Sequence, residues 1–191
     1  MTGFILLRRE VAPFFLALAG LALAALAADG VLHLLRLVWI GRYLGIPGVL
    51  LIAGSFGYSL RKRQLIKVGR PVPLLRLHER MAWAGSLLVL VHAGIHFNAV
   101  LAWLAVAAML VNITSGLTGK YLMQRARKRL EAAREILQGL PPAEIQDRMY
   151  WDSLTYDLIR KWRVVHVPIA LAFVVLATAH IVSIFLFWGW K

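Results

Sequence analysis

Residues 164–188 read VVHVPIALAFVVLATAHIVSIFLFW, and this stretch decides the fold class. A helix needs about 20 mostly apolar residues to cross a hydrocarbon core of about 30 Å. The stretch contains no charged residue, and its apolar residues run on without the alternation of a barrel strand. It therefore predicts a membrane-spanning helix.

Four more apolar runs of similar length occur at about residues 11–34, 43–60, 77–97 and 99–119. The whole chain of 191 residues is 60% hydrophobic and 16% charged, with a mean hydropathy of +0.70. Such a composition excludes an ordinary soluble domain. We predict an all-α integral membrane protein in which residues 1–191 form one domain with five transmembrane helices.

The positive charges orient these helices. If the N-terminus is cytoplasmic, segments 61–80 and 120–163 are cytoplasmic too, and together with Arg8 and Arg9 they carry 19 of the 22 Lys and Arg residues. The positive-inside rule then predicts a cytoplasmic N-terminus and an external C-terminus. It also accounts for the net charge of +13 without a nucleic-acid surface.

The long polar segment at residues 124–161 lies between the fourth and fifth runs. Apolar residues recur at helical spacing on both sides of the breaking sequence Gly139-Leu140-Pro141-Pro142. This pattern predicts a cytoplasmic helical hairpin inserted within the domain. Its aromatic residues suit the membrane interface or a peripheral subunit equally well, and they are Tyr150, Trp151 and Tyr156.

Four of the six histidines form two pairs with the same spacing, His78 with His92 and His166 with His180. Fourteen residues of helix rise about 21 Å and return to nearly the same face. In the predicted topology both helices run outward, so His78 and His166 share the inner depth, and His92 and His180 share the outer one. Two imidazoles saturate a haem iron and favour electron transfer. We predict two haem b groups with these histidines as the axial ligands of the iron.

Two other interpretations of the histidines remain open. An intramembrane histidine often only hydrogen-bonds to a neighbouring helix. The four side chains would then belong to a haem-free structural membrane anchor, or to a pigment-binding protein in which they bind chlorophyll magnesium.

Weaker candidates lie near the predicted ligands. Gly85 is midway between His78 and His92, where a missing side chain would let a porphyrin approach, although ordinary helix packing explains a glycine equally well. Cationic residues near the inner histidines would pair with haem propionates, or merely follow the positive-inside rule, and they are Arg76, Arg80, Lys161 and Arg163. The second ring nitrogen of each ligand should bond a backbone carbonyl or a hydroxyl on the helix.

A quinone site is a further, weaker prediction. Asp29 and His33 are four residues apart on one face of the first run, near its outer end, and would accept protons from a quinol. Interface polarity explains them nearly as well. Glu79 is the inner counterpart, and His96 is a second candidate for the ligand role of His92, although its spacing does not match that of the fifth run.

What the sequence lacks also limits the function. Without cysteine, this chain attaches no c-type haem and supplies no thiolate to an iron–sulfur cluster. It has no Gly-rich dinucleotide fingerprint, so we expect an electron-transfer subunit rather than a self-sufficient enzyme. The expected partners are peripheral iron–sulfur, flavin or multihaem cytochrome subunits, together with membrane lipid and quinone.

The paired H-x13-H pattern resembles the haem core of respiratory cytochrome b subunits and of ferric-reductase-like and NADPH-oxidase membrane domains. Four segments within about residues 75–188 also resemble a group of prokaryotic cytochrome-b-like membrane proteins: His78 to Gly94, Ser115 to Leu122, Arg163 to Pro168 and His180 to Ser183. The resemblance implies a membrane-anchor subunit of a larger redox complex in the prokaryotic cytoplasmic membrane, which exchanges electrons with quinone.

Overall fold

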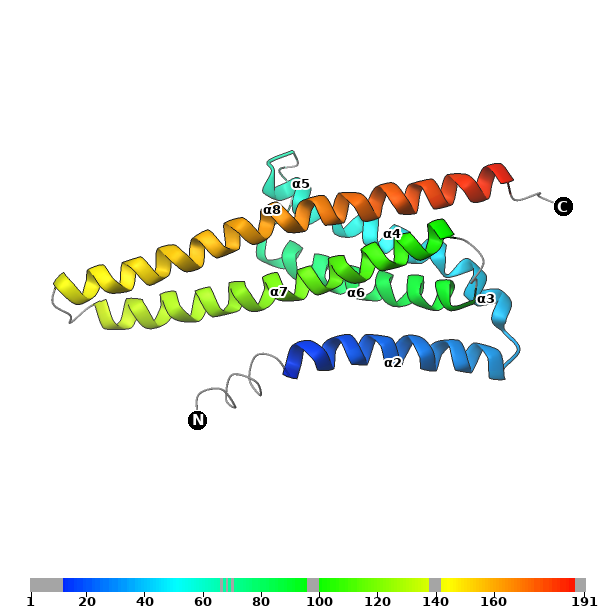
Figure 1. Cartoon of the computed structure of the whole chain (residues 1–191), viewed down its shortest axis with the longest axis horizontal. Helices are drawn as coiled ribbons and strands as arrows, with labels where there is room; N and C mark the ends of the chain where they lie inside the picture. The colour runs from blue at the N-terminus through cyan, green and yellow to red at the C-terminus, as the bar shows by residue number, and fades with distance from the viewer. Residues whose placement is uncertain are drawn as a thin grey trace. The chain divides into compact units, whose positions relative to one another are not determined.

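The computed structural model describes residues 12–65, 67, 69, 71–95, 100–137 and 142–187, with only the helical course given for 62, 71, 72, 95 and 122–160. The regular structure in these ranges is helical, as predicted, and no strand occurs in them (Figure 1). The helices are α2 (Ala12–Leu34), α3 (Val38–Tyr43), α4 (Gly45–Ser55), α5 (Gly57–Lys62), α6 (Pro71–Ile95), α7 (Val100–Leu137) and α8 (Pro142–Phe187).

Four helical stretches in the described ranges are long and apolar enough to cross a membrane: Ala12–Leu34, Val38–Arg61, Val100–Tyr121 and Lys161–Phe187. Few of their side chains are buried inside the protein, and large apolar side chains on each of them are exposed, among them Leu26, Leu50, Leu104 and Val175. Outward apolar surfaces are expected where lipid is the solvent. These four helices fit an integral membrane protein and correspond to four of the five predicted spans.

The remaining predicted span, at residues 77–97, coincides with α6, which is 25 residues long but is not among the four stretches. Its first half carries Arg76, Glu79 and Arg80, which lower its hydropathy. The number of spans decides whether the two termini face the same side of the membrane. The fifth span and the orientation of the chain therefore stay predictions.

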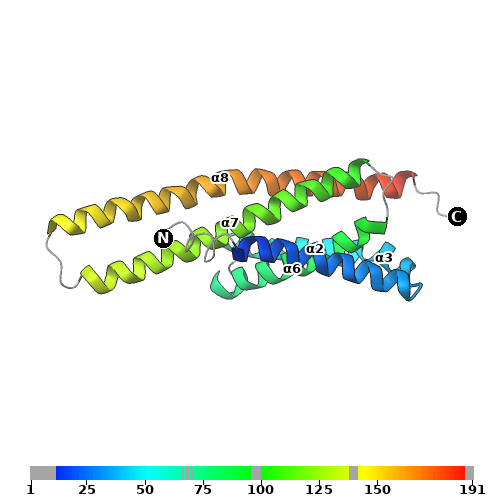
Figure 2. The ribbon, with the colours of Figure 1, turned by 60° about the horizontal axis from the view of Figure 1, so that its bottom comes forward.

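The helices belong to two compact units, which are described separately. The first is residues 16–106, where α4 packs along α6, and α3 and α5 contact the same helix. The second is residues 107–191 with the N-terminal segment up to Phe15. In it α7 and α8 run side by side over a long distance in both views (Figures 1 and 2).

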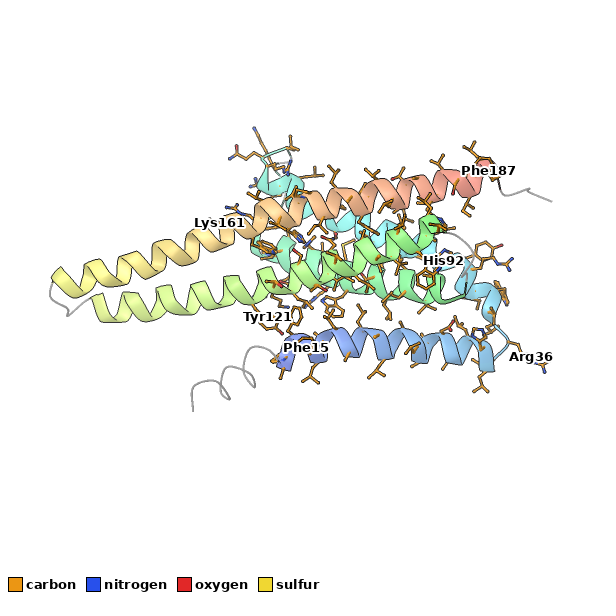
Figure 3. All side chains as sticks on the ribbon, in the orientation of Figure 1. Phe15, Arg36, His92, Tyr121, Lys161 and Phe187 are labelled. Carbon is orange, nitrogen blue, oxygen red and sulfur yellow. The ribbon has the colours of Figure 1, made fainter. Side chains whose placement is uncertain are left out.

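The predicted hairpin at residues 124–161 is built from the extensions of these two helices. Beyond Tyr121, α7 continues to Leu137, and α8 begins at Pro142, well before Lys161 (Figure 3). At 1.5 Å per residue each extension adds about 25 Å to its helix. Both arms are thus helical, as predicted, but they are continuous with the candidate spans rather than separate short helices.

The second candidate span is broken twice, at Leu44 and at Phe56. Pro47 explains the first break, because a proline ring clashes with the carbonyl four residues earlier. The Leu44 N–H donates instead to the Gly41 carbonyl at 3.2 Å, and the Phe56 N–H donates to the Ala53 carbonyl at 3.1 Å. Carbonyls in the last turn of a helix lack helical partners and accept hydrogen bonds from elsewhere. The two breaks therefore leave carbonyls available as acceptors at the end of α3 and at the end of α4.

Candidate functional site

Each predicted histidine pair lies on one continuous helix. His78 and His92 are in α6, and His166 and His180 are in α8. This confirms the helical basis of the 14-residue spacing, which separates the two members of a pair by about 21 Å along the axis. Since α6 and α8 belong to different compact units, each pair is described within its own unit.

The histidines of α6 are held by main-chain carbonyls of the broken span. His78 Nδ1 donates to the Ser55 carbonyl oxygen at 2.9 Å. His92 Nδ1 donates to the Gly41 carbonyl oxygen at 3.3 Å. Ser55 is the last residue of α4 and Gly41 is in the last turn of α3, so both acceptors lie where a helical segment ends. A carbonyl thus bonds one ring nitrogen of each histidine, as predicted, but the oxygens come from neighbouring helices and not from α6 itself.

Two glycines set the register of these contacts. Gly85 is seven residues from each histidine of α6, and Gly48 is seven residues from each acceptor. A Cβ at Gly85 would lie 2.7 Å from the Gly48 carbonyl oxygen, and a Cβ at Gly48 would lie 3.0 Å from the Gly85 carbonyl oxygen. The two backbones meet here because both side chains are missing. Helix packing, one of the two interpretations left open by the sequence, therefore accounts for Gly85 without a porphyrin.

The carbonyl acceptors also fix the tautomer of both imidazoles. A carbonyl oxygen only accepts, so Nδ1 must carry a proton and the lone pair of a neutral ring lies on Nε2. Other groups restrict the rings further. The Tyr58 ring lies 6.0 Å from that of His78, and a Cβ at Gly45 would lie only 2.9 Å from His92 Cδ2. Both rings are thus oriented by the first unit alone, in the tautomer that metal-ligating histidines use.

His166, the first histidine of α8, is contacted by two side chains. His166 Nδ1 lies 3.0 Å from the Ser115 hydroxyl oxygen in α7. Trp162, one turn earlier in α8, stacks on the imidazole with a centroid distance of 4.9 Å and an interplanar angle of 23°, and its indole N–H donates to the Ser115 carbonyl at 2.8 Å. Gly119 makes room for the indole, since a Cβ there would overlap the Trp162 ring. A hydroxyl therefore lies against His166 Nδ1, as predicted, but it belongs to α7 and not to the helix of the histidine.

His180 is half-buried in α8, and its own carbonyl accepts a hydrogen bond from the Ser183 hydroxyl at 2.7 Å. The Ser183 bond closes one turn of the helix around the backbone of this histidine. It involves the carbonyl and not the imidazole. The buried Nδ1 atom of His180 makes no hydrogen bond within the described residues, so the predicted contact with a carbonyl or hydroxyl is not found at this nitrogen.

The cationic candidates differ in their surroundings. Arg76 and Arg80 are exposed and lie two positions from His78, a spacing that places them on other faces of α6. Lys161 is exposed as well. Arg163 is half-buried, and its Nε is shielded from solvent with no hydrogen-bond partner in the described part of the chain. Among the four, Arg163 has the surroundings that best suit an anionic group.

Asp29 and His33 share a helix face, as predicted. His33 Nδ1 lies 2.9 Å from the Asp29 carbonyl oxygen and 3.6 Å from its carboxylate Oδ1. The Asp29 side chain is 25% exposed and the His33 side chain 56%. The Asp29 carboxylate faces α6, where a Cβ at Gly94 would be 3.8 Å away. Glu79 is half-buried on α6, and His96 lies outside the described residues.

Sequence reasoning did not single out Trp162, Ser115 or the two carbonyl acceptors as functional. A tryptophan one turn before a histidine, W-x3-H, is a signal that was visible in the chain. The main-chain acceptors leave no such signal, because any residue type has a carbonyl. In the described ranges, no group of three or more His, Cys, Asp or Glu side chains converges as a ligand set for a metal ion.

Comparison with protein-family models, with curated proteins and with solved structures finds no match to this chain. The function is therefore inferred from its own residues.

Proposed function

We propose that the protein is an electron-transfer cytochrome b of the membrane, with one haem b between His78 and His166 and a second between His92 and His180. One observation carries the proposal. Three of these four imidazoles have Nδ1 bonded to an oxygen, which leaves Nε2 as the ligating nitrogen. When bound, a haem supplies a one-electron couple, and two imidazoles keep its iron saturated.

The equal spacing in α6 and α8 supports the pairing of the ligands. Fourteen residues separate the two histidines in both helices, so two helices that cross the membrane in the same direction offer two pairs at matched depths. Arg163, with its shielded Nε, is the residue we assign to a propionate at the inner depth. Arg76, Arg80 and Lys161 contribute general positive charge at the same depth.

Five spans are part of this proposal, with α6 as the third. Its segment from Met81 to Ile95 is free of charged residues, and the charged residues before it would lie in the headgroup region. The N-terminus is then cytoplasmic, and the arms of the hairpin at residues 124–161 extend into the cytoplasm of a prokaryotic cell. His78 lies at the inner surface in this arrangement.

The protein would act as the membrane-anchor subunit of a larger redox complex. A peripheral iron–sulfur, flavin or multihaem subunit would exchange electrons with the inner haem through the hairpin. Quinone would exchange electrons at the outer depth, where Asp29 and His33 offer a proton acceptor pair. The side chains of this chain would thus bind the haems, hold the imidazole rings and receive protons.

The experiment is a visible spectrum of the purified full-length chain with a haem assay. We expect b-type α-bands on dithionite reduction and two haems per chain, because the chain offers two complete ligand pairs. An absence of haem would refute the proposal. Bound magnesium pigment would then point to a pigment protein, and a colourless chain to a structural anchor.

A further inference from the structure

Ser115 is shared by two side chains of α8. Its hydroxyl oxygen lies 3.0 Å from His166 Nδ1, and its carbonyl oxygen accepts the Trp162 indole N–H at 2.8 Å. The indole and imidazole rings are stacked at 4.9 Å and 23°. One residue of α7 thus holds two neighbouring rings of α8 in a fixed relation.

His166 needs this additional restraint more than the histidines of α6 do. Their acceptors, Ser55 and Gly41, are main-chain carbonyls that cannot rotate. The oxygen beside His166 Nδ1 belongs to a serine hydroxyl, which can change rotamer about its Cα–Cβ bond. A stacked ring that is itself anchored limits the rotation that the hydroxyl permits.

Trp162 is anchored in this way at both ends. Its N–H is bonded to α7, and its six-membered ring lies where Gly119 has no side chain. A Cβ at Gly119 would overlap the indole, whereas a Cβ at Gly116 would make only ordinary contact, 3.8 Å from His166 Cε1. Gly119 therefore leaves the space that the Trp162 indole fills, and the indole in turn stacks on the His166 imidazole.

We propose that Ser115 and Trp162 are positioning residues for His166 as an axial ligand: Ser115 accepts the Nδ1 proton, and Trp162 fixes the plane of the imidazole. This inference rests on the proposed function. An Nδ1–H that donates to an oxygen makes the imidazole more electron-rich, which stabilises the oxidised iron. Ser115 would therefore lower the reduction potential of the haem that His166 ligates, and Trp162 would set the ring orientation without adding charge.

The first test replaces the hydroxyl. In Ser115→Ala, one of the two haems should change its reduction equilibrium by about tenfold toward the reduced state, which is about 59 mV for one electron, while the other haem keeps its potential. Ser115→Thr retains a hydroxyl and should restore most of the shift. Thr118→Ala is the matched control, because the Thr118 hydroxyl bonds the Thr114 carbonyl of its own helix at 2.9 Å.

The second test displaces the Trp162 indole by filling the space beside Gly119. Gly119→Ala should displace the indole and change the low-spin ferric EPR signal of one haem, since that signal depends on the planes of the axial imidazoles. Gly116→Ala adds the same methyl group one turn away and should leave the signal unchanged. A parallel redox titration should show a smaller potential change for Gly119→Ala than for Ser115→Ala.

The results separate this inference from the proposed function. A parent chain without haem overturns both. A parent with two haems, whose potentials are unaltered in Ser115→Ala and whose EPR signals are unaltered in Gly119→Ala, overturns the positioning roles and leaves the cytochrome standing. Equal shifts of both haems in Ser115→Ala would indicate a general disturbance of the fold and would also overturn them.

Discussion

The backbone of Gly85 lies against that of Gly48, so that a Cβ added to Gly85 would be 2.7 Å from the Gly48 carbonyl oxygen. This contact is the centre of the seam between α4 and α6. Seven residues away in either direction, the seam brings an imidazole of α6 to a carbonyl of the broken span. The packing of two glycines is thus connected to the orientation of two histidines.

Gly85→Ala should destabilise the protein by about 1–3 kcal/mol, the usual result of overfilling a close-packed contact. Both neighbours of the new methyl group, Gly48 and Ile52, belong to α4, so the helices must move apart. Thermal unfolding of the purified chain in detergent measures the change. Gly20→Ala is the control, since its Cβ would meet nothing within 4 Å and alanine favours a helix. Equal unfolding temperatures of Gly85→Ala and the parent would show that the seam is looser than described.

His92→Ala should remove about one haem per chain and spare the other, because each iron needs both imidazoles for low-spin ligation. Haem content and the reduced spectrum of the purified variant measure this. His96→Ala should keep both haems. If His92→Ala keeps both bis-histidine spectra and His96→Ala loses one, the outer ligand is His96.

Asp29→Asn and His33→Ala should slow the reduction of the haems by quinol by at least about tenfold, since a positioned acid or base typically contributes about 10²–10⁴-fold. Reduction by dithionite, which needs no proton acceptor, serves as the control and should be unchanged. Stopped-flow absorbance of the haem bands measures both rates. Parent-like quinol rates in both variants would move the proton acceptor elsewhere, with Glu79 on α6 as the next residue to test.

A double change of Tyr150 and Trp151 to alanine should release a peripheral subunit and leave the haem content intact, because aromatic anchors carry much of the energy of an interface. Co-purification from native membranes, followed by mass spectrometry of the complex, measures the loss. Undiminished co-purification would favour a lipid-facing role for the two side chains, which lie outside the described ones.

The sequence predicts the helical class and four of the spans well, because long apolar runs such as the one around His180 leave few alternatives to a membrane helix. The sequence also predicts a span at residues 77–97, but α6 is not among the four candidate stretches, since Arg76, Glu79 and Arg80 lower its hydropathy. The two breaks in the second span were also missed. Pro47 signals the first, and Gly54 and Gly57 are weaker signals of the second.

The candidate site was also predicted only in part. Spacing alone finds the histidines, because a helix repeats its faces regularly. Their hydrogen-bond acceptors depend on which helices pack together and in what register. A hydropathy pattern gives neither the pairing of the helices nor the register. Gly85 shows the difficulty, because the sequence does not distinguish a glycine that packs against a porphyrin from one that packs against another backbone. Ser115 and Trp162 become significant only when α7 and α8 are seen to pair.

The carbonyl acceptors of His78 and His92 have a consequence for how this half of the protein can change over time. A substitution at position 55 leaves the acceptor in place, because the oxygen belongs to the main chain. Insertion or deletion of one residue between positions 41 and 55 would instead turn one carbonyl by about 100° around its helix and leave one imidazole without its acceptor. The span can therefore tolerate drift in amino-acid identity at its acceptors, but not a change in its length.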